Sequence, residues 1–212
     1  MTTLDSLQFL FAGSLLGLTA GISPGPLLTL VMTQTLRYNQ REGIKVALSP
    51  LVTDLPIILI TLVLIAKIAQ SDTILGIISL AGGIFVAHLG YESITSKGIA
   101  AGQPDAGSKS LRKGIMANFL SPHPYLFWAT VGAPYVLKAH GQGLLSVIFF
   151  LGSFYFLLVG SKISVALLVA RSKKFMGEKT YRIIMWFLGT ALFVFSLMFL
   201  YEGYQYLTGS ST

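Results

Sequence analysis

Long apolar runs separated by short polar segments fill most of this chain. Six of them approach or exceed the roughly 20 residues that a helix needs to cross the apolar part of a bilayer. Their bounds are 7–36, 44–69, 74–94, 115–137, 144–170 and 183–207. The pattern predicts an all-α membrane protein with six transmembrane helices, in a single integral membrane domain over residues 1–212.

Two of the six runs are interrupted by a Ser-Pro-x-Pro motif. Proline lacks a backbone N–H, and its ring clashes with the carbonyl one turn earlier, so neither motif fits inside an unbroken helix. The sequence therefore predicts that the first and fourth helices are broken. The two motifs are Ser23-Pro24-Gly25-Pro26 and Ser121-Pro122-His123-Pro124.

Both motifs fall in the first run of a three-run half. The halves are about 1–95 and 110–212, joined by a loop over 96–113 that is rich in small and polar residues. Because each half has an odd number of runs, the second half must enter the membrane from the opposite face. We therefore expect a 3+3 inverted-topology repeat, which many transporters share.

Composition supports a membrane protein and removes several classes of chemistry. Hydrophobic residues make up 53% of the chain and charged residues only 11%, far from the balance of a soluble domain. There is no cysteine in the sequence, which excludes disulfides, thiolate metal sites and dithiol redox chemistry.

The basic residues are concentrated on one side of the predicted membrane. Twelve of the 15 lysines and arginines lie in or beside the loops that follow the first, third and fifth runs. The positive-inside rule places these loops in the cytoplasm and both termini on the outer side. This distribution explains the net charge of +7 without a nucleic-acid partner.

A few residues inside the apolar runs carry candidate chemistry. An ionisable group in a membrane is costly and is expected to face a partner or a watery cavity. Asp54 is such a group, and the alternative is a structural role, either in an ion pair or as a carboxylate that caps a kink beside Pro56. Lys162 is another, for which an ion pair with Asp54 and a contact with substrate or coupling ion both remain open. His123 could titrate or could bond freed carbonyls.

These features fall at similar depths. At about 1.5 Å per residue, Asp54, Lys162 and the two motifs lie roughly 10–18 Å from the cytoplasmic ends of their runs. A broken helix exposes N–H groups that attract a carboxylate, and exposed carbonyls together with Asp54 can hold an ammonium. A zwitterionic amino acid offers both charges. A further pattern, a glycine at every fourth position from Gly13 to Gly25, predicts close helix packing.

The chain resembles the LysE-type amino-acid exporters, which include the lysine and homoserine/threonine exporters. The resemblance rests on the first Ser-Pro-Gly-Pro motif, Gly43 after an arginine-rich loop, Asp54, and the segment from Asn118 to Pro122. It implies a secondary exporter of amino acids or related small metabolites in the bacterial inner membrane, driven by an ion gradient. The family often has Gly and Lys at the positions of Thr53 and His123, and Lys162 lies outside the shared pattern.

The leading hypothesis is proton-coupled export of an amino acid or a similar small organic ion. An inorganic-cation exporter of the same architecture is the alternative, although a single intramembrane aspartate does not provide the several oxygen ligands of a dedicated divalent site. No enzyme motif is present, so we expect neither catalysis nor a cofactor nor a metal site. The expected partners are the substrate, the coupling ion and the bilayer, and a homo-oligomer stays open. The residues expected at the substrate or coupling site are Ser23, Pro24, Gly25, Pro26, Asp54, Asn118, Pro122, His123 and Lys162.

Overall fold

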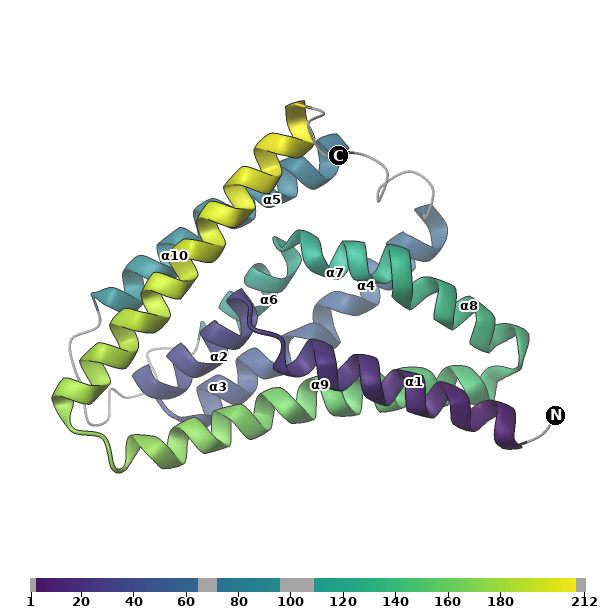
Figure 1. Cartoon of the computed structure of the whole chain (residues 1–212), viewed down its shortest axis with the longest axis horizontal. Helices are drawn as coiled ribbons and strands as arrows, with labels where there is room; N and C mark the ends of the chain where they lie inside the picture. The colour runs from purple at the N-terminus through teal and green to yellow at the C-terminus, as the bar shows by residue number, and fades with distance from the viewer. Residues whose placement is uncertain (1–2, 65–71, 96–108, 209–212) are drawn as a thin grey trace.

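The computed structural model describes residues 3–64, 72–95 and 109–208, and all the regular secondary structure in these segments is helical. Side chains are described from residue 7 to 59 in the first segment. The helices, shown in Figure 1, are α1 (Thr3–Ile22), α2 (Pro26–Arg37), α3 (Gln40–Ala47), α4 (Ser49–Leu64), α5 (Asp72–Ile94), α6 (Ser110–Phe119), α7 (Pro122–Phe127), a short π-helix η1 (Trp128–Gly132), α8 (Ala133–Gly141), α9 (Leu144–Lys173) and α10 (Glu178–Thr208).

The first apolar run leaves helical geometry at its Ser-Pro-Gly-Pro motif. Helix α1 ends at Ile22 and α2 begins at Pro26, and their axes differ in direction by 59°. Pro26 occupies the first position of α2, where its missing N–H costs no hydrogen bond and its fixed φ already suits a helix. Gly25 at the N-cap is fully extended and has no neighbour within 4 Å of a Cβ built on it.

The second motif lies at a comparable junction. Helix α6 ends at Phe119 and α7 begins at Pro122, again with proline in the first turn. The chain then continues through η1 and α8 to Gly141, so helical structure extends beyond the run over 115–137 at both ends. The second run also differs from expectation, because Leu48 separates α3 from α4 and the helical structure starts four residues before Ile44.

The glycines of the stripe that lie in α1 pack against α9; the sequence predicts such a close contact but not the partner helix. A Cβ on Gly13 or Gly17 would overlap a backbone carbonyl oxygen of α9, that of Phe150 or Phe154. A Cβ on Gly21 would overlap the hydroxyl of Ser161. The absence of side chains therefore allows the two helices to lie in direct backbone contact along their length, as Figure 1 shows.

Helices α5 and α10 form the second long pair, and their seam is symmetric. Small residues recur every seventh position on both helices and meet in antiparallel order, Gly76 with Gly203, Gly83 with Ser196 and Gly90 with Gly189. The Ser196 hydroxyl donates to the Gly83 carbonyl at 2.8 Å. The leucines beside these glycines occupy matching positions on the two helices: Leu207 of α10 lies over Gly76, and Leu80 of α5 lies over Gly203. Gly82 packs separately, against the Leu120 carbonyl at the end of α6.

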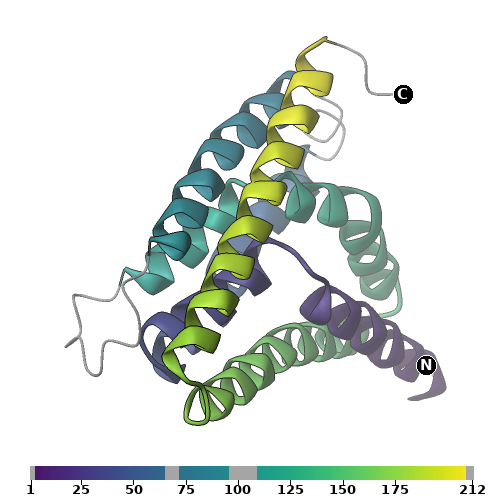
Figure 2. The same cartoon turned by 60° about the vertical axis from the view of Figure 1, so that its left-hand side comes forward.

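The shorter helices lie between these two long pairs. Figures 1 and 2 show α5 and α10 together on one side of the molecule and α1 with α9 on another, with α2, α3, α4 and α6 between them. One hydrophobic cluster joins these layers: Leu30 and Val46 of α2 and α3 pack with Val86 of α5, Ala166 of α9 and Phe199 of α10. This cluster therefore joins the short helices to both long pairs.

The helices fit a multi-pass membrane protein. By length and composition, α5, α9 and α10 are each sufficient to cross a bilayer, and α1 with α2 form a fourth candidate if the bent pair is one span. Large apolar side chains point outward on these helices, including Phe11, Phe156, Trp186 and Phe187. Such a surface is expected to face lipid. The end of the run over 44–69 and most of the loop over 96–113 lie outside the described residues.

An ion-pair cluster joins three helices near the predicted cytoplasmic end. The Glu92 carboxylate of α5 is 2.7 Å from the guanidinium of Arg37 on α2 and 2.6 Å from the ammonium of Lys113 on α6. Arg37 also donates to the Glu92 carbonyl. One half-buried carboxylate therefore connects the two halves of the chain.

Candidate transport site

A cavity of about 330 Å³ lies where the two Ser-Pro-x-Pro motifs face each other. Its volume is at the lower end of the roughly 300–1,000 Å³ typical of small-molecule sites. It contains both intramembrane charges that the sequence singles out, and much of the remaining wall is aromatic. The residues that line it are Ala20, Ser23, Pro24, Gly25, Pro26, Leu27, Leu28, Pro50, Asp54, Ala117, Asn118, Ser121, His123, Pro124, Phe127, Trp128, Phe154, Leu158, Lys162, Phe195, Met198 and Phe199.

Asp54 is the acidic group of this cavity, and it is only 4% exposed. Oδ1 accepts from Asn118 Nδ2 at 3.0 Å and lies 3.3 Å from the Thr53 hydroxyl, while Oδ2 accepts from the Tyr155 hydroxyl at 3.3 Å. Helices α4, α6 and α9 each contribute one of these donors. The carboxylate is therefore held at the meeting point of three helices by neutral donors.

Asn118 connects the two halves at this point. Its Nδ2 donates to the Thr53 hydroxyl at 2.6 Å as well as to Asp54. The Thr53 hydroxyl is also 3.1 Å from the Ser49 carbonyl within α4. Asn118 is buried, and each of its partners belongs to the other half of the chain. The asparagine that precedes the second motif thus positions the aspartate that follows the first.

Lys162 is the basic group of the cavity and is also 4% exposed. Its ammonium donates to the Gly21 carbonyl at 2.9 Å and to the Ala20 carbonyl at 3.1 Å. These carbonyls belong to the last turn of α1, where the helix can no longer pair them. The structure forms no ion pair between Lys162 and Asp54, so the proposed direct pair is absent and the lysine caps a helix terminus instead.

The opposite side of the break presents hydrogen-bond donors. Helix α2 starts with no side-chain cap, and its first backbone bond at this end runs from Thr29 N to Gly25 O. The N–H groups of Leu27 and Leu28 precede that bond, and both residues line the cavity. A helix N-terminus carries a partial positive charge and favours an anion.

His123 has a packing environment in addition to its place on the cavity wall. Its ring lies 5.6 Å from the Phe199 ring, centroid to centroid, and its Nδ1 is 3.4 Å from the Ser121 hydroxyl. Aromatic side chains from α7, η1 and α9 form the adjoining wall, with Trp128 against Phe154 and Phe127 stacked on Phe154. Trp128 also lies over Gly132, where a Cβ would overlap its ring.

The structure brings together most of the residues that the sequence singles out. Eight of the nine predicted site residues line the cavity, and Pro122 is the exception, because it is buried at the start of α7 beside Ser121. Sequence reasoning missed Tyr155 and the aromatic wall. One available signal was the spacing of Tyr155 and Lys162, which are seven residues apart and therefore share a face of α9.

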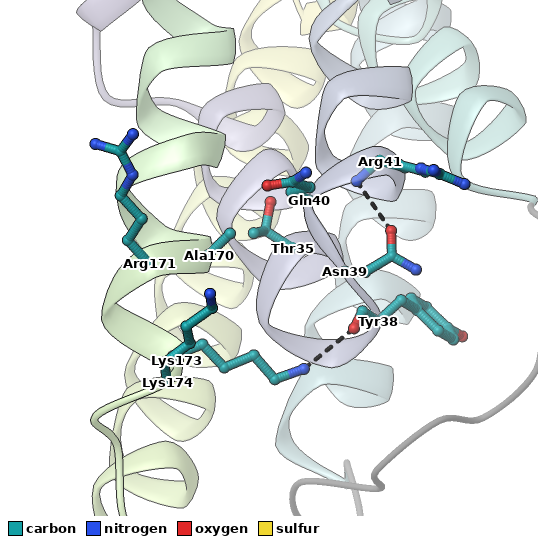
Figure 3. Close-up of a pocket in the computed structure, with 9 residues that line it drawn as sticks. All are labelled: Thr35, Tyr38, Asn39, Gln40, Arg41, Ala170, Arg171, Lys173 and Lys174. Carbon is teal, nitrogen blue, oxygen red and sulfur yellow. Dashed lines mark hydrogen bonds between the residues drawn. The ribbon is translucent and has the colours of Figure 1, made fainter.

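A second cavity, of about 730 Å³, has a different character (Figure 3). It lies at the ends of α2 and α9 and at the start of α3, where Lys173 donates to the Tyr38 carbonyl at 3.1 Å. Within the described segments, four basic residues and no acidic one line it; the basic residues are Arg41, Arg171, Lys173 and Lys174. Its position among the loops predicted to be cytoplasmic, away from the helix breaks, argues against a transport site.

Fold and site define a multi-pass helical membrane protein with a small, mostly apolar cavity that contains a few polar and charged groups at interrupted helices, which is the architecture of a small-molecule translocator. The family comparison agrees: the model of the LysE type translocator family matches residues 18–203. The chain therefore belongs to the LysE type translocator family. Comparisons with curated proteins and with solved structures return no significant match.

Proposed function

We propose that this protein is a secondary exporter of zwitterionic amino acids, or closely related small metabolites, in the bacterial inner membrane. One observation supports the proposal above the others. A single small cavity contains a buried carboxylate, a buried ammonium and the uncapped N-terminus of a helix. These groups offer opposite charges to the two charged ends of an amino acid.

The position of each group suggests how the substrate binds. The donors to Asp54 in the described part of the chain are neutral, so it is the group available to a substrate ammonium. The N–H groups of Leu27 and Leu28 favour the carboxylate. The aromatic and aliphatic wall then receives the substrate side chain, in the usual arrangement of a mostly apolar pocket with a few polar groups that fix orientation.

Proton coupling follows from the same carboxylate. When Asp54 is ionised it attracts an ammonium, and when it is protonated that attraction disappears. Binding of a proton and of substrate then compete at one group, which is a sufficient basis for exchange of the two across the membrane. Tyr155, Asn118 and Thr53 keep the carboxylate in place in either state.

The proposed architecture is the six-span inverted repeat, with both termini on the outer side. The symmetric α5–α10 seam supports it, because two spans that are exchanged by a twofold axis and touch each other must meet at matched positions, as these helices do. The contact between Asn118 and Asp54 supports it too, since it joins the two halves beside the breaks.

Efflux from proteoliposomes tests this function. Vesicles containing the purified protein are loaded with each of a panel of labelled amino acids, and release is measured with and without an imposed proton gradient. We expect release of at least one uncharged-side-chain amino acid, accelerated by the gradient and absent from empty vesicles. Release of metal cations but of no amino acid would favour the inorganic-cation alternative and contradict the proposal.

A further inference from the structure

Lys162 occupies a position that a substrate cation would otherwise take. The last carbonyls of a helix carry a partial negative charge, equivalent to about half an elementary charge for the whole terminus. In transporters with broken helices, such carbonyls are ligands for cations. Here the ammonium of Lys162 already lies 2.9 Å and 3.1 Å from two of them.

The local structure fixes the lysine in this position. Gly21, one of the two acceptors, lies so close to α9 that a Cβ would overlap the hydroxyl of Ser161, the residue before Lys162. The close approach of α1 and α9 therefore brings the stem of Lys162 directly beside the terminus of α1. At 4% exposure, the ammonium is shielded from water and depends on these acceptors.

The cavity consequently has a fixed charge balance. Asp54 contributes one negative charge and Lys162 one positive charge, and both line the same space. No other Asp, Glu, Lys or Arg among the residues that the structure describes lines it. A zwitterion with an uncharged side chain leaves this balance unchanged. A dibasic amino acid or a diamine adds a second cation with no carboxylate to receive it.

We propose that Lys162 is a specificity-determining residue that excludes cationic substrates by acting as a tethered ammonium in the cation subsite at the end of α1. The inference rests on the proposed function and narrows its substrate class to amino acids with uncharged, mainly apolar side chains. The aromatic wall made by Phe127, Phe154 and Phe199 suits such side chains.

A purely structural role for Lys162 predicts different results from a role in substrate specificity. If the lysine only stabilised the end of α1, its loss would lower the stability of the protein and the rates for all substrates alike. A specificity role predicts instead that the order of preference changes. The carbonyls of Ala20 and Gly21 would be left without their donor, and a cationic substrate side chain could replace it.

The experiment compares leucine and lysine efflux from proteoliposomes containing wild-type protein, Lys162→Gln, Lys162→Met or Lys162→Arg. We expect wild type and Lys162→Arg to export leucine in preference to lysine. In the two neutral variants the ratio of lysine to leucine export should rise by about tenfold or more, because removal of a like charge from a poorly solvated site removes a large penalty. Thermal stabilisation of the detergent-solubilised protein by lysine, measured on the same variants, reports binding even where transport is lost.

The outcomes separate this inference from the proposed function. If wild type exports leucine but the neutral variants neither export lysine nor gain stability with it, the inference is wrong and the function stands. Efficient export of lysine by the wild type also overturns the inference alone. If wild type exports no amino acid, both are overturned. Lys162→Arg is the matched control, since it retains the charge at the same place.

Discussion

At the scale of single residues, the organising feature is a network that holds Asp54 without neutralising it. Asn118, Thr53 and Tyr155 all present neutral donors to the carboxylate. A salt bridge would have paired the Asp54 carboxylate with a fixed positive charge. The ammonium of Lys162 instead donates to the Gly21 carbonyl at the end of α1. The carboxylate thus keeps its charge available for a ligand while its geometry is fixed.

Asn118→Ala tests the importance of this network. The substitution removes the donor shared by Thr53 and Asp54 in a buried position, and an unsatisfied buried partner costs about 1–3 kcal/mol. We expect a lower thermal midpoint and a transport rate reduced by at least about tenfold, since misplaced binding groups are strongly penalised. Tyr155→Phe is the milder comparison, because it removes one donor and leaves the ring in place. Equal activity of Asn118→Ala and wild type would contradict the role of the network.

Some of this site could be predicted from sequence, and some could not. Proline and glycine chemistry identifies the two breaks, and the cost of a membrane-embedded charge identifies Asp54 and Lys162. The acceptors of Lys162 could not be predicted, because its partners are backbone carbonyls about 140 positions earlier in the chain, and such contacts leave no mark in composition or periodicity. The hydrogen bonds from Asn118 to Thr53 and Asp54 could not be predicted for the same reason, because these residues lie far apart in the sequence.

At the scale of helices, two pairs with small-residue seams determine the arrangement: α1 and α9 run parallel, and α5 and α10 run antiparallel. The α1–α9 contact brings Lys162 to the end of α1. In the α5–α10 pair, matching positions of the two helices meet, so an approximate twofold rotation exchanges one helix with the other. Glycine spacing predicted close packing in α1, and the structure supplies the partner. Neither the partner nor the symmetry of the α5–α10 seam could be read from one sequence, because a stripe of small residues specifies a close contact but not which helix makes it.

Gly17→Leu tests the α1–α9 contact. A side chain at this position would overlap the Phe154 backbone, so the helices must separate and the acceptors of Lys162 must move. We expect loss of thermal stability by several degrees or more, as overpacking typically costs about 1–3 kcal/mol, together with loss of transport. Gly152→Ala is the control on α9, because a Cβ there meets nothing within 4 Å. Its thermal midpoint should equal or exceed that of wild type, and a similar loss in both variants would contradict the assignment.

At the scale of the whole molecule, the two halves of the chain meet at one cavity. The Glu92 cluster joins them near the predicted cytoplasmic end, and Asn118 with Asp54 joins them at the breaks. Six apolar runs could be counted in the sequence, but their helices begin and end elsewhere. Leu48 interrupts the second run, and a π-helix at Trp128–Gly132 lies within the fourth. This π-helix lies just before Pro134, and the Trp128 ring fills the space beside Gly132.

The proposed orientation can be tested by single-cysteine labelling, which the absence of native cysteine makes free of background. Gly141→Cys and Lys174→Cys place thiols at exposed sites in successive connections between helices. A membrane-impermeant maleimide is added to cells whose outer membrane is permeabilised and whose inner membrane is intact. We expect labelling of Gly141→Cys and not of Lys174→Cys. Inverted vesicles should show the opposite result. Labelling of Lys174→Cys from outside would contradict the orientation.

The central claim is that the cavity around Asp54 is the site of transport. The most direct test is amino-acid efflux from proteoliposomes containing Asp54→Asn, with Glu178→Gln as a matched acid-to-amide control at an exposed surface pair with Arg182. Asparagine keeps the size of the side chain and removes the charge that attracts the substrate ammonium and the proton. We predict that Asp54→Asn inserts and remains folded but loses gradient-driven efflux, while Glu178→Gln behaves as wild type. Wild-type, proton-driven efflux from Asp54→Asn would contradict the account.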